Sequence, residues 1–166
     1  MHCPNRPLVI VVLALTLLMA GCGNKDLLPS YVGPVYPPTS DVEVIFQYTQ
    51  APESCRVFTR ALLFLPAGYD GAGIAATVTG EAARRGADMV LVGNTREAEK
   101  NKQALFIYYP VDQEYNCRQD WSGWKFGYDT WKDLGQWVSM GVREWGNPRV
   151  SYEKPLVIQM AFLRCR

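Results

Sequence analysis

A short apolar run near the N-terminus is the feature that most constrains the fold and location of this chain. Residues 8–19 read LVIVVLALTLLM, twelve positions with one polar residue, Thr16. A helix needs about 20 residues to cross the ~30 Å hydrocarbon core of a bilayer, so this run is too short to be a membrane span. It has the length of the apolar region of a secretion signal, and Arg6 supplies the cation that precedes such a region. We therefore expect residues 1–21 to be an export signal.

A cysteine motif ends this run. Residues 18–22 read LMAGC, so small residues lie directly before Cys22. The motif resembles the lipobox of bacterial lipoproteins, with Met19 where leucine is usual. The resemblance implies that Cys22 becomes the first mature residue and carries acyl chains that hold it on a membrane. Gly23 follows instead of aspartate, which implies the periplasmic face of the outer membrane in a Gram-negative host and otherwise the extracytoplasmic face of the plasma membrane. A plain secretion signal, or a buried helix with a chance cysteine, is the alternative.

Removal of the signal restricts the chemistry of the mature chain. The full chain has 17 Lys+Arg, 16 Asp+Glu and one His. The signal holds Arg6 and His2, so 16 basic and 16 acidic residues remain, without histidine. Such a chain cannot build a Ser-His-Asp triad, a histidine base or a His-ligated metal site. Its zero net charge gives no basic surface for nucleic acid. We expect a non-enzymatic protein without a cofactor or a nucleic-acid partner.

Residues 22–40 predict a spacer after the signal. The stretch 23–40 reads GNKDLLPSYVGPVYPPTS and contains four prolines. Proline fixes φ, removes a hydrogen-bond donor and restricts the residue before it, so neither a helix nor a central strand is expected. The composition predicts a solvated, extended stalk between Cys22 and the folded domain. A docking segment for a partner is the alternative.

Residues 41–166 predict a single α+β domain. Apolar alternation and apolar runs predict strands over 41–50, 57–65, 88–93, 104–111 and 155–165. Residues 73–85 predict a helix with Gly86 as its C-terminal cap. Residues 95–103 predict a charged loop or a short exposed helix, and Pro110 marks the end of a strand or a sheet edge. These elements favour a small mixed or antiparallel sheet with one or two helices packed on one face.

One glycine pattern precedes the predicted helix. Residues 71–76 match the G-x-G-x-x-A order of dinucleotide-binding turns. A loop separates these glycines from the strand before them, and the chain is too short for a full two-half fold. We interpret the pattern as a glycine-rich turn into a helix.

Two blocks of the domain carry a family resemblance. The first runs from Cys55 through 81–85 (EAARR) and 86–88 (GAD) to the apolar strand at 89–92, and the second is 161–165 (AFLRC). The pattern is similar to small bacterial surface lipoproteins, including the sensor lipoproteins of the Rcs envelope-stress type and related families of unassigned function. The resemblance implies a binding or sensing role without chemistry. The region of about 113–151 looks like an insertion relative to that pattern.

Three cysteines remain after the signal and the lipidated residue, namely Cys55, Cys117 and Cys165. An exported chain enters an oxidising compartment, so a disulfide is expected, and the odd number leaves one thiol over. The resemblance implies that Cys55 pairs with Cys165. The sequence itself leaves Cys117 free to pair with either, and it offers no C-x₂-C spacing for a three-cysteine zinc site.

All five tryptophans fall within residues 121–145. Residues 130–145 predict an amphipathic helix that begins with a Thr130/Asp133 capping box and is weakened by Gly135 and Gly141. One face of this helix would carry Trp131, Leu134, Val138, Val142 and Trp145. Trp124 and Trp137 fall off that face, so we expect them to be the exposed pair.

The tryptophan cluster leaves three interpretations open. The rings could form the core, or Trp121, Trp124 and Trp137 could bind a glycan or peptidoglycan, or the cluster could contact a protein or the membrane interface. The sequence as a whole predicts a membrane-anchored bacterial lipoprotein that acts as a binding or sensing module in the cell envelope. A module that binds cell-wall glycan through the tryptophans is the alternative.

Overall fold

The computed structural model describes residues 31–100 and 103–165, so the predicted signal and Cys22 lie outside the described residues. In chain order the elements are β1 (Glu43–Ile45), the 3-10 turn η2 (Tyr48–Gln50), β2 (Cys55–Leu65), α2 (Gly71–Arg84), β3 (Met89–Glu97), β4 (Leu105–Asn116), α3 (Cys117–Asp120), α4 (Tyr128–Trp131) and β5 (Leu156–Cys165).

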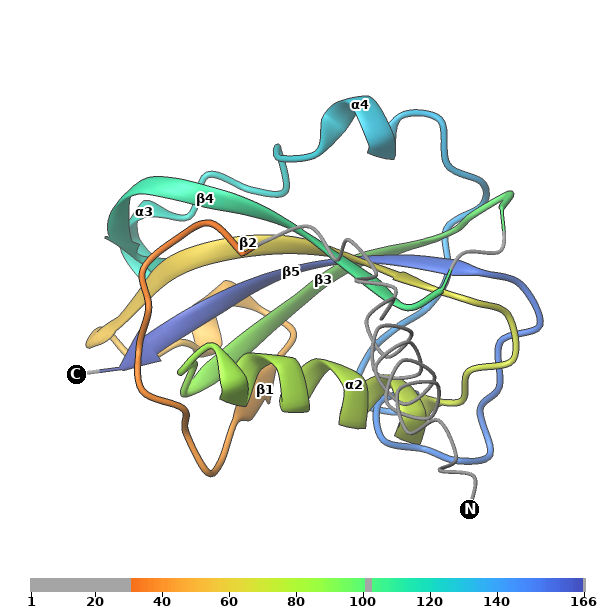
Figure 1. Cartoon of the computed structure of the whole chain (residues 1–166), viewed down its shortest axis with the longest axis horizontal. Coiled ribbons are helices and arrows are strands. Elements are labelled where there is room, and N and C mark those ends of the chain that lie inside the picture. The colour runs from red at the N-terminus through yellow and green to blue at the C-terminus, as the bar shows by residue number, and fades with distance from the viewer. Residues whose placement is uncertain (1–30, 101–102, 166) are drawn as a thin grey trace, which may run out of the picture.

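The strands form one mixed five-stranded sheet in the order β1-β3-β5-β2-β4. β1 runs parallel to β3, and the other neighbouring strands are antiparallel. α2 lies on one face of the sheet, and the first part of the long connection from β4 to β5, which contains α4, crosses the opposite face (Figure 1). The later part of this connection returns to the first face, where Val138, Met140 and Trp145 pack against the cluster that contains Ile74 of α2. The predicted α+β class, with a mixed sheet and a helix on one face, is confirmed.

Both faces of the sheet are apolar because its central strands alternate between two buried sides. In β2, Leu63 packs in the cluster that contains Ile74 of α2. Its neighbour Leu62 packs in a second cluster with Phe126 and Trp131. Successive strand residues point to opposite faces, so an almost continuously apolar strand needs cover on both sides. The tryptophan-rich connection supplies the second cover.

α2 forms where capping residues and apolar spacing agree. The Asp70 side chain accepts a hydrogen bond from the Gly73 N–H at 2.6 Å, which caps the helix. Ile74, Val78 and Ala82, spaced four apart, are fully buried against the sheet. Gly86 follows the helix with φ at +76°. The helix predicted over 73–85 is confirmed, with bounds shifted by one or two residues.

One strand prediction and one loop prediction needed correction. The strand expected over 41–50 is only β1, because the Gln50 side chain accepts the N–H groups of Phe46 and Gln47 (3.0 and 2.9 Å) and bends the chain into η2. The charged loop expected from residue 95 is wrong for residues 95–97, which continue β3 and pair with β5.

β4 is longer than the predicted strand over 104–111 and passes through Pro110. It lies at the edge of the sheet, where one side of its backbone needs no partner strand, so a proline is tolerated. The non-strand connection therefore begins at Cys117, four residues after the predicted insertion start at 113.

The helix predicted over 130–145 is wrong. Only α4 forms, and its N-cap is Gly127 instead of Thr130. From residue 135 the backbone pairs with the end of β3: the Gly135 N–H bonds Glu97 O at 2.8 Å, and the Val138 N–H bonds Thr95 O at 3.0 Å. This pairing outcompetes a helix that two glycines already weaken. The predicted apolar face does not form, since the Val142 side chain is 77% exposed.

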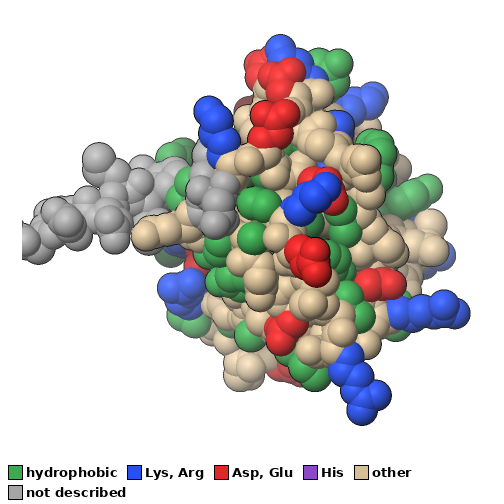
Figure 2. All heavy atoms as spheres, turned by 90° about the vertical axis from the view of Figure 1, so that its right-hand side faces the viewer, with side chains coloured by type: hydrophobic (Ala, Val, Ile, Leu, Met, Phe, Trp, Pro, Cys, Tyr) green, Lys and Arg blue, Asp and Glu red, His purple; other side chains and the backbone are tan. Residues whose placement is uncertain are grey.

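The outer surface carries both signs of charge. Figure 2 shows one end of the molecule, where acidic, basic and hydrophobic side chains are interspersed. This distribution agrees with the near-zero net charge of the chain.

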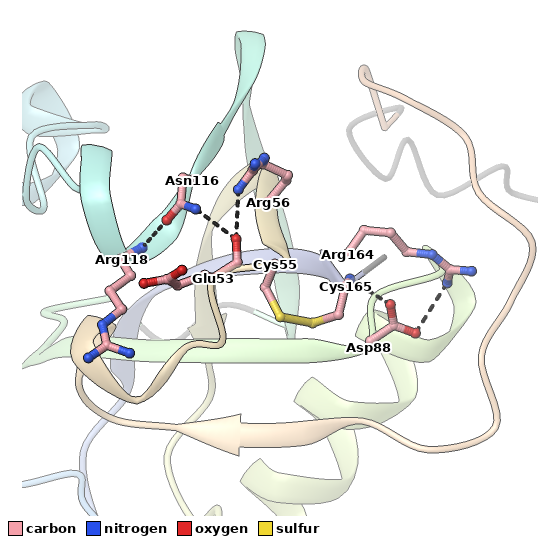
Figure 3. The surroundings of a disulfide bond; sticks show 8 residues. All are labelled: Glu53, Cys55, Arg56, Asp88, Asn116, Arg118, Arg164 and Cys165. Atoms are coloured by element: carbon pink, nitrogen blue, oxygen red, sulfur yellow. Dashed lines mark hydrogen bonds and ion pairs between the residues drawn. A yellow bond between two sulfur atoms is a disulfide. The ribbon is translucent and has the colours of Figure 1, made fainter.

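A disulfide joins the two central strands, as Figure 3 shows. Cys55 at the start of β2 is bonded to Cys165 at the end of β5, opposite it in the sheet, and their Cα atoms are 3.9 Å apart. Asp88 accepts a hydrogen bond from the Cys165 N–H at 2.8 Å and pairs with Arg164 at 3.4 Å. On the chain-entropy model, closing a loop of about 100 residues contributes up to about 4.7 kcal/mol. The pairing implied by the resemblance is present.

Residues 31–40, hereafter the strap, form neither helix nor strand, as the prolines predict. They are not a solvated stalk, however, because they lie against the domain. The Tyr36 ring packs edge-on against buried Phe58, with centroids 5.2 Å apart. The Thr39 N–H donates to Ala83 O at 3.0 Å. The folded unit therefore includes these ten residues, and the rest of the predicted spacer, residues 22–30, lies outside the described residues.

Candidate functional site

The tryptophan-rich connection divides its rings between core and surface. Trp131 is buried, Trp121, Trp124 and Trp145 are half-buried, and Trp137 is 64% exposed. The exposure predicted for Trp137 is confirmed, whereas Trp124 is exposed only in part. Much of the segment thus serves as the second cover of the sheet, and two places on it remain open to a ligand.

The first place is a groove between η2 and the start of the connection, which we call the aromatic groove. Its cavity is about 280 Å³. One wall is the turn of residues 46–49, the opposite wall is made by Trp121 and Trp124, and Leu91 of β3 also lines it. The structure therefore joins two of the three predicted site residues and adds Phe46, Gln47, Tyr48 and Thr49, whose sequence carries no sign of a site.

Ring contacts fix the tryptophan wall. Trp121 and Trp124 pack edge to face, with centroids 4.8 Å apart and ring planes at 74°. Trp124 also contacts Phe126 at 5.9 Å. Aromatic pairs in this arrangement are favourable beyond the area they bury. The two indoles thus form a corner that opens toward the groove.

Residues of the strands beneath the groove hold the two indole rings in place. The Trp124 ring lies so close to β3 that a Cβ on Gly93 would be 2.2 Å from its Cζ2 atom. The fully buried Gln159 of β5 donates from Nε2 to the backbone oxygens of Trp124 and Phe126, each at 3.3 Å. Asn94 donates to Gln159 Oε1 at 3.1 Å. Gly93 and Gln159 are thus positioning residues that sequence reasoning missed, because their partners lie some 30 residues away.

The groove is electrically neutral. None of the residues that line it carries a charged side chain. Gln47, Tyr48 and Thr49 are exposed and offer amide and hydroxyl groups that can donate and accept hydrogen bonds. Aromatic walls with a few polar groups at the rim suit a ligand that has both apolar faces and hydroxyl or amide groups.

The second place is the exposed ring of Trp137. Its backbone bridges to Arg96 of β3. The Arg96 guanidinium lies 5.4 Å from the Trp137 ring and 5.7 Å from the Trp131 ring. It donates to the backbone oxygens of Trp131 (2.7 Å), Leu134 and Gly135 (2.8 Å). These contacts hold an exposed indole in one position, apart from the aromatic groove.

Another cavity, about 240 Å³, lies between α2 and β4. Glu81 is only 5% exposed there and accepts from the Tyr108 hydroxyl while pairing with Arg84 and Arg85. Burial, followed by the nearby carboxylate, raises the pKa of Tyr108. The carboxylate thus has three partners, and through Tyr108 the cluster ties α2 to β4.

The glycine pattern at the start of α2 proves to be a packing feature. A Cβ on Gly71 would lie 2.0 Å from Glu144 O. The Gly71 N–H donates to Val150 O at 2.9 Å, and Asp70 occupies the Gly73 N–H. These N–H groups are therefore engaged within the protein, in agreement with a turn into a helix.

Cys117 is the remaining thiol. It is buried, and burial raises its pKa to about 11. Within residues 31–100 and 103–165, no group of three or more His, Cys, Asp and Glu side chains is arranged to hold a metal ion. In the same part of the chain, no helix is both long and apolar enough to cross a bilayer.

No protein-family model, curated protein or solved structure matches this chain. The resemblance to sensor lipoproteins therefore stays a prediction, and function has to be argued from the groove.

Proposed function

We propose that this protein is a membrane-anchored, non-enzymatic binding module of the bacterial cell envelope, and that its aromatic groove binds a neutral stretch of cell-wall glycan. The anchor is the lipid on Cys22 that the LMAGC motif predicts. The observation that carries the proposal is the uncharged groove of about 280 Å³ with Trp121 and Trp124 as its wall.

Sugar rings have a flat face of C–H bonds and an edge of hydroxyl groups. An indole ring offers a flat apolar surface for the C–H face, and the corner made by Trp121 and Trp124 offers two such surfaces nearly at right angles. Gln47, Tyr48 and Thr49 at the opposite wall can form hydrogen bonds with the hydroxyl groups of the sugar. A hollow of this kind favours a glycan over a flat protein partner, which a broad apolar patch would suit better.

Preorganisation also supports binding. The indole wall is fixed by Gln159 and by its close seat on Gly93, so little side-chain freedom is lost when a ligand arrives. A glycan ligand and a lipid anchor would together place the protein between membrane and wall.

Retention on purified cell-wall sacculi tests the proposal, with residues 23–166 as the soluble protein. Tyr48→Ala removes a groove ring that is 42% exposed, and it should abolish most retention without unfolding the domain. Tyr128→Ala is the matched control, because Tyr128 is 68% exposed on α4 and lies outside the groove. Circular dichroism should show both variants folded.

A protein partner at Trp137 is the second candidate, since a clamped and exposed tryptophan is typical of interface hot spots. Purified sacculi offer glycan and no protein partner, so a Trp137 that binds a protein predicts unchanged retention of Trp137→Ala in this assay. Loss of retention with Trp137→Ala but not with Tyr48→Ala would move the binding surface to Trp137. If the unaltered protein is not retained on sacculi, the glycan proposal is wrong.

A further inference from the structure

The strap is the one segment that would connect the predicted anchor to the domain. Tyr31, its first described residue, follows Cys22 by nine positions. The Tyr31 ring packs edge-on against Tyr108 of β4 with centroids 4.9 Å apart, and the Arg85 guanidinium lies 4.5 Å from it. Tyr36 packs on Phe58 further along, and Thr39 bonds the end of α2. Any pull from the anchor would reach these contacts in that order.

The domain is shaped to receive the strap. A Cβ on Gly86 would lie 2.5 Å from Tyr36 Cβ and 2.6 Å from Pro37 O, so only glycine lets the strap lie this close to the end of α2. Tyr36 is partly buried and packs against the main apolar cluster, and the Arg164 guanidinium lies 5.7 Å from its ring. The docked position is therefore specific and not a chance contact of a loose tail.

The attachment of the strap differs in kind from that of the strands. β2 and β5 pair along ten rows, whereas the strap belongs to no strand of the described sheet. It is held by the rings of Tyr31 and Tyr36 and by a few hydrogen bonds, from the Tyr36 hydroxyl to Glu114 and from Thr39 to the backbone oxygens of Ala83 and Ala87. Val32 and Val35 between these rings are 61% and 87% exposed. Segments with few buried contacts open locally at lower cost than core strands. The strap can therefore leave while the sheet stays intact.

We propose that the strap is a releasable element: a pull between the membrane anchor and a ligand in the aromatic groove draws residues 31–40 off the domain and uncovers the aromatic surface around Phe58 and Tyr108. The protein would then report tension between membrane and wall. The two points between which the pull acts, the lipid anchor and the ligand in the aromatic groove, rest on the proposed function. Release of the strap is a property of the domain and can be measured without lipid or glycan.

Hydrogen exchange at the Thr39 amide measures release directly, because this N–H is bonded to Ala83 O only while the strap is docked. Gly86→Ala should displace Tyr36 and Pro37 and raise the exchange rate about tenfold or more. Gly146→Ala is the matched control: its φ of +71° strains an alanine as the +76° of Gly86 does, but no atom lies within 4 Å of the added Cβ. Equal exchange rates in the two variants would overturn the proposal.

Single-molecule pulling tests the response to force in the full chain, with handles at the N-terminus and at exposed Ser122→Cys beside the groove. Release should give a first step of at most about 35 Å, the extended length of ten residues, before the domain unfolds. Gly86→Ala should remove that step, and Gly146→Ala should keep it. A strap that leaves only with global unfolding refutes the proposal whatever the sacculi show. Failure of sacculi binding with a releasable strap refutes the glycan ligand alone.

Discussion

Gln159 shows how one buried polar side chain sets the position of the groove. It interrupts the apolar run of residues 156–163 in β5 and is completely buried. An unpaired amide there would cost about 1–3 kcal/mol, and the structure avoids this cost by using the amide to bond Trp124 O and Phe126 O. The same bonds satisfy two carbonyl groups of an irregular loop, which has no strand partner of its own at that point. A single residue thus holds the tryptophan wall to the sheet.

Cys117 allows a prediction about reactivity. The thiolate is the reactive form, and burial raises the pKa of this thiol to about 11, so at pH 8 the native protein should keep it protonated. We expect iodoacetamide to label Cys117 at least about tenfold more slowly in the folded than in the urea-unfolded protein, with the native rate rising toward pH 11. Mass spectrometry of the alkylated peptide gives both rates. Rapid native labelling at pH 8 would show that the thiol is accessible, and the Cys55–Cys165 disulfide, unlabelled in both states, is the internal control.

At the scale of elements, local signals predicted β2, α2 and β5 well, because capping, apolar period and tertiary packing agree there. They failed where a distant contact decided the outcome. The spacing of 130–145 fits a helix, yet residues 135 and 138 gain strand pairing with Thr95 and Glu97, some 40 positions earlier. The groove was foreseen only as a tryptophan cluster, since its opposite wall depends on how Gln50 bends the chain.

Gly93→Ala tests how β3 and the tryptophan loop depend on each other. The added Cβ would lie 2.2–2.4 Å from three atoms of the Trp124 ring, so the ring must move off the strand. We expect a loss of about 1–3 kcal/mol in the free energy of unfolding, measured in urea, together with weaker retention on sacculi. Gly80→Ala is the control: nothing lies within 4 Å of its Cβ, and in a helix interior it should raise stability by up to about 1 kcal/mol. Unchanged stability of Gly93→Ala would mean that the Trp124 ring does not pack against β3 at Gly93.

At the scale of the whole molecule, the sheet is the middle of three layers with different tasks. α2, the strap and the later part of the β4–β5 connection cover one face, and the first part of that connection covers the other and forms one wall of the groove (Figure 1). The Cys55–Cys165 bond joins the two central strands between these layers. Under the proposed function, a load applied at the strap and resisted at the groove would pass through these disulfide-linked strands, and the strap, which belongs to no strand of the described sheet, would yield first.

Charge gives the last prediction, because neither the groove nor the chain as a whole attracts ions strongly. The groove lining holds no charged side chain, and the 17 basic residues of the chain nearly balance its 16 acidic ones. Binding through ring stacking and neutral hydrogen bonds should be insensitive to screening, so retention on sacculi should stay constant from about 0.05 M to about 0.5 M NaCl. Lys125→Ala, which removes an exposed cation between Trp124 and Phe126, should also leave retention unchanged. Retention that falls with salt, or with Lys125→Ala, would show that the wall is held through its anionic groups, and the neutral glycan would no longer be the ligand.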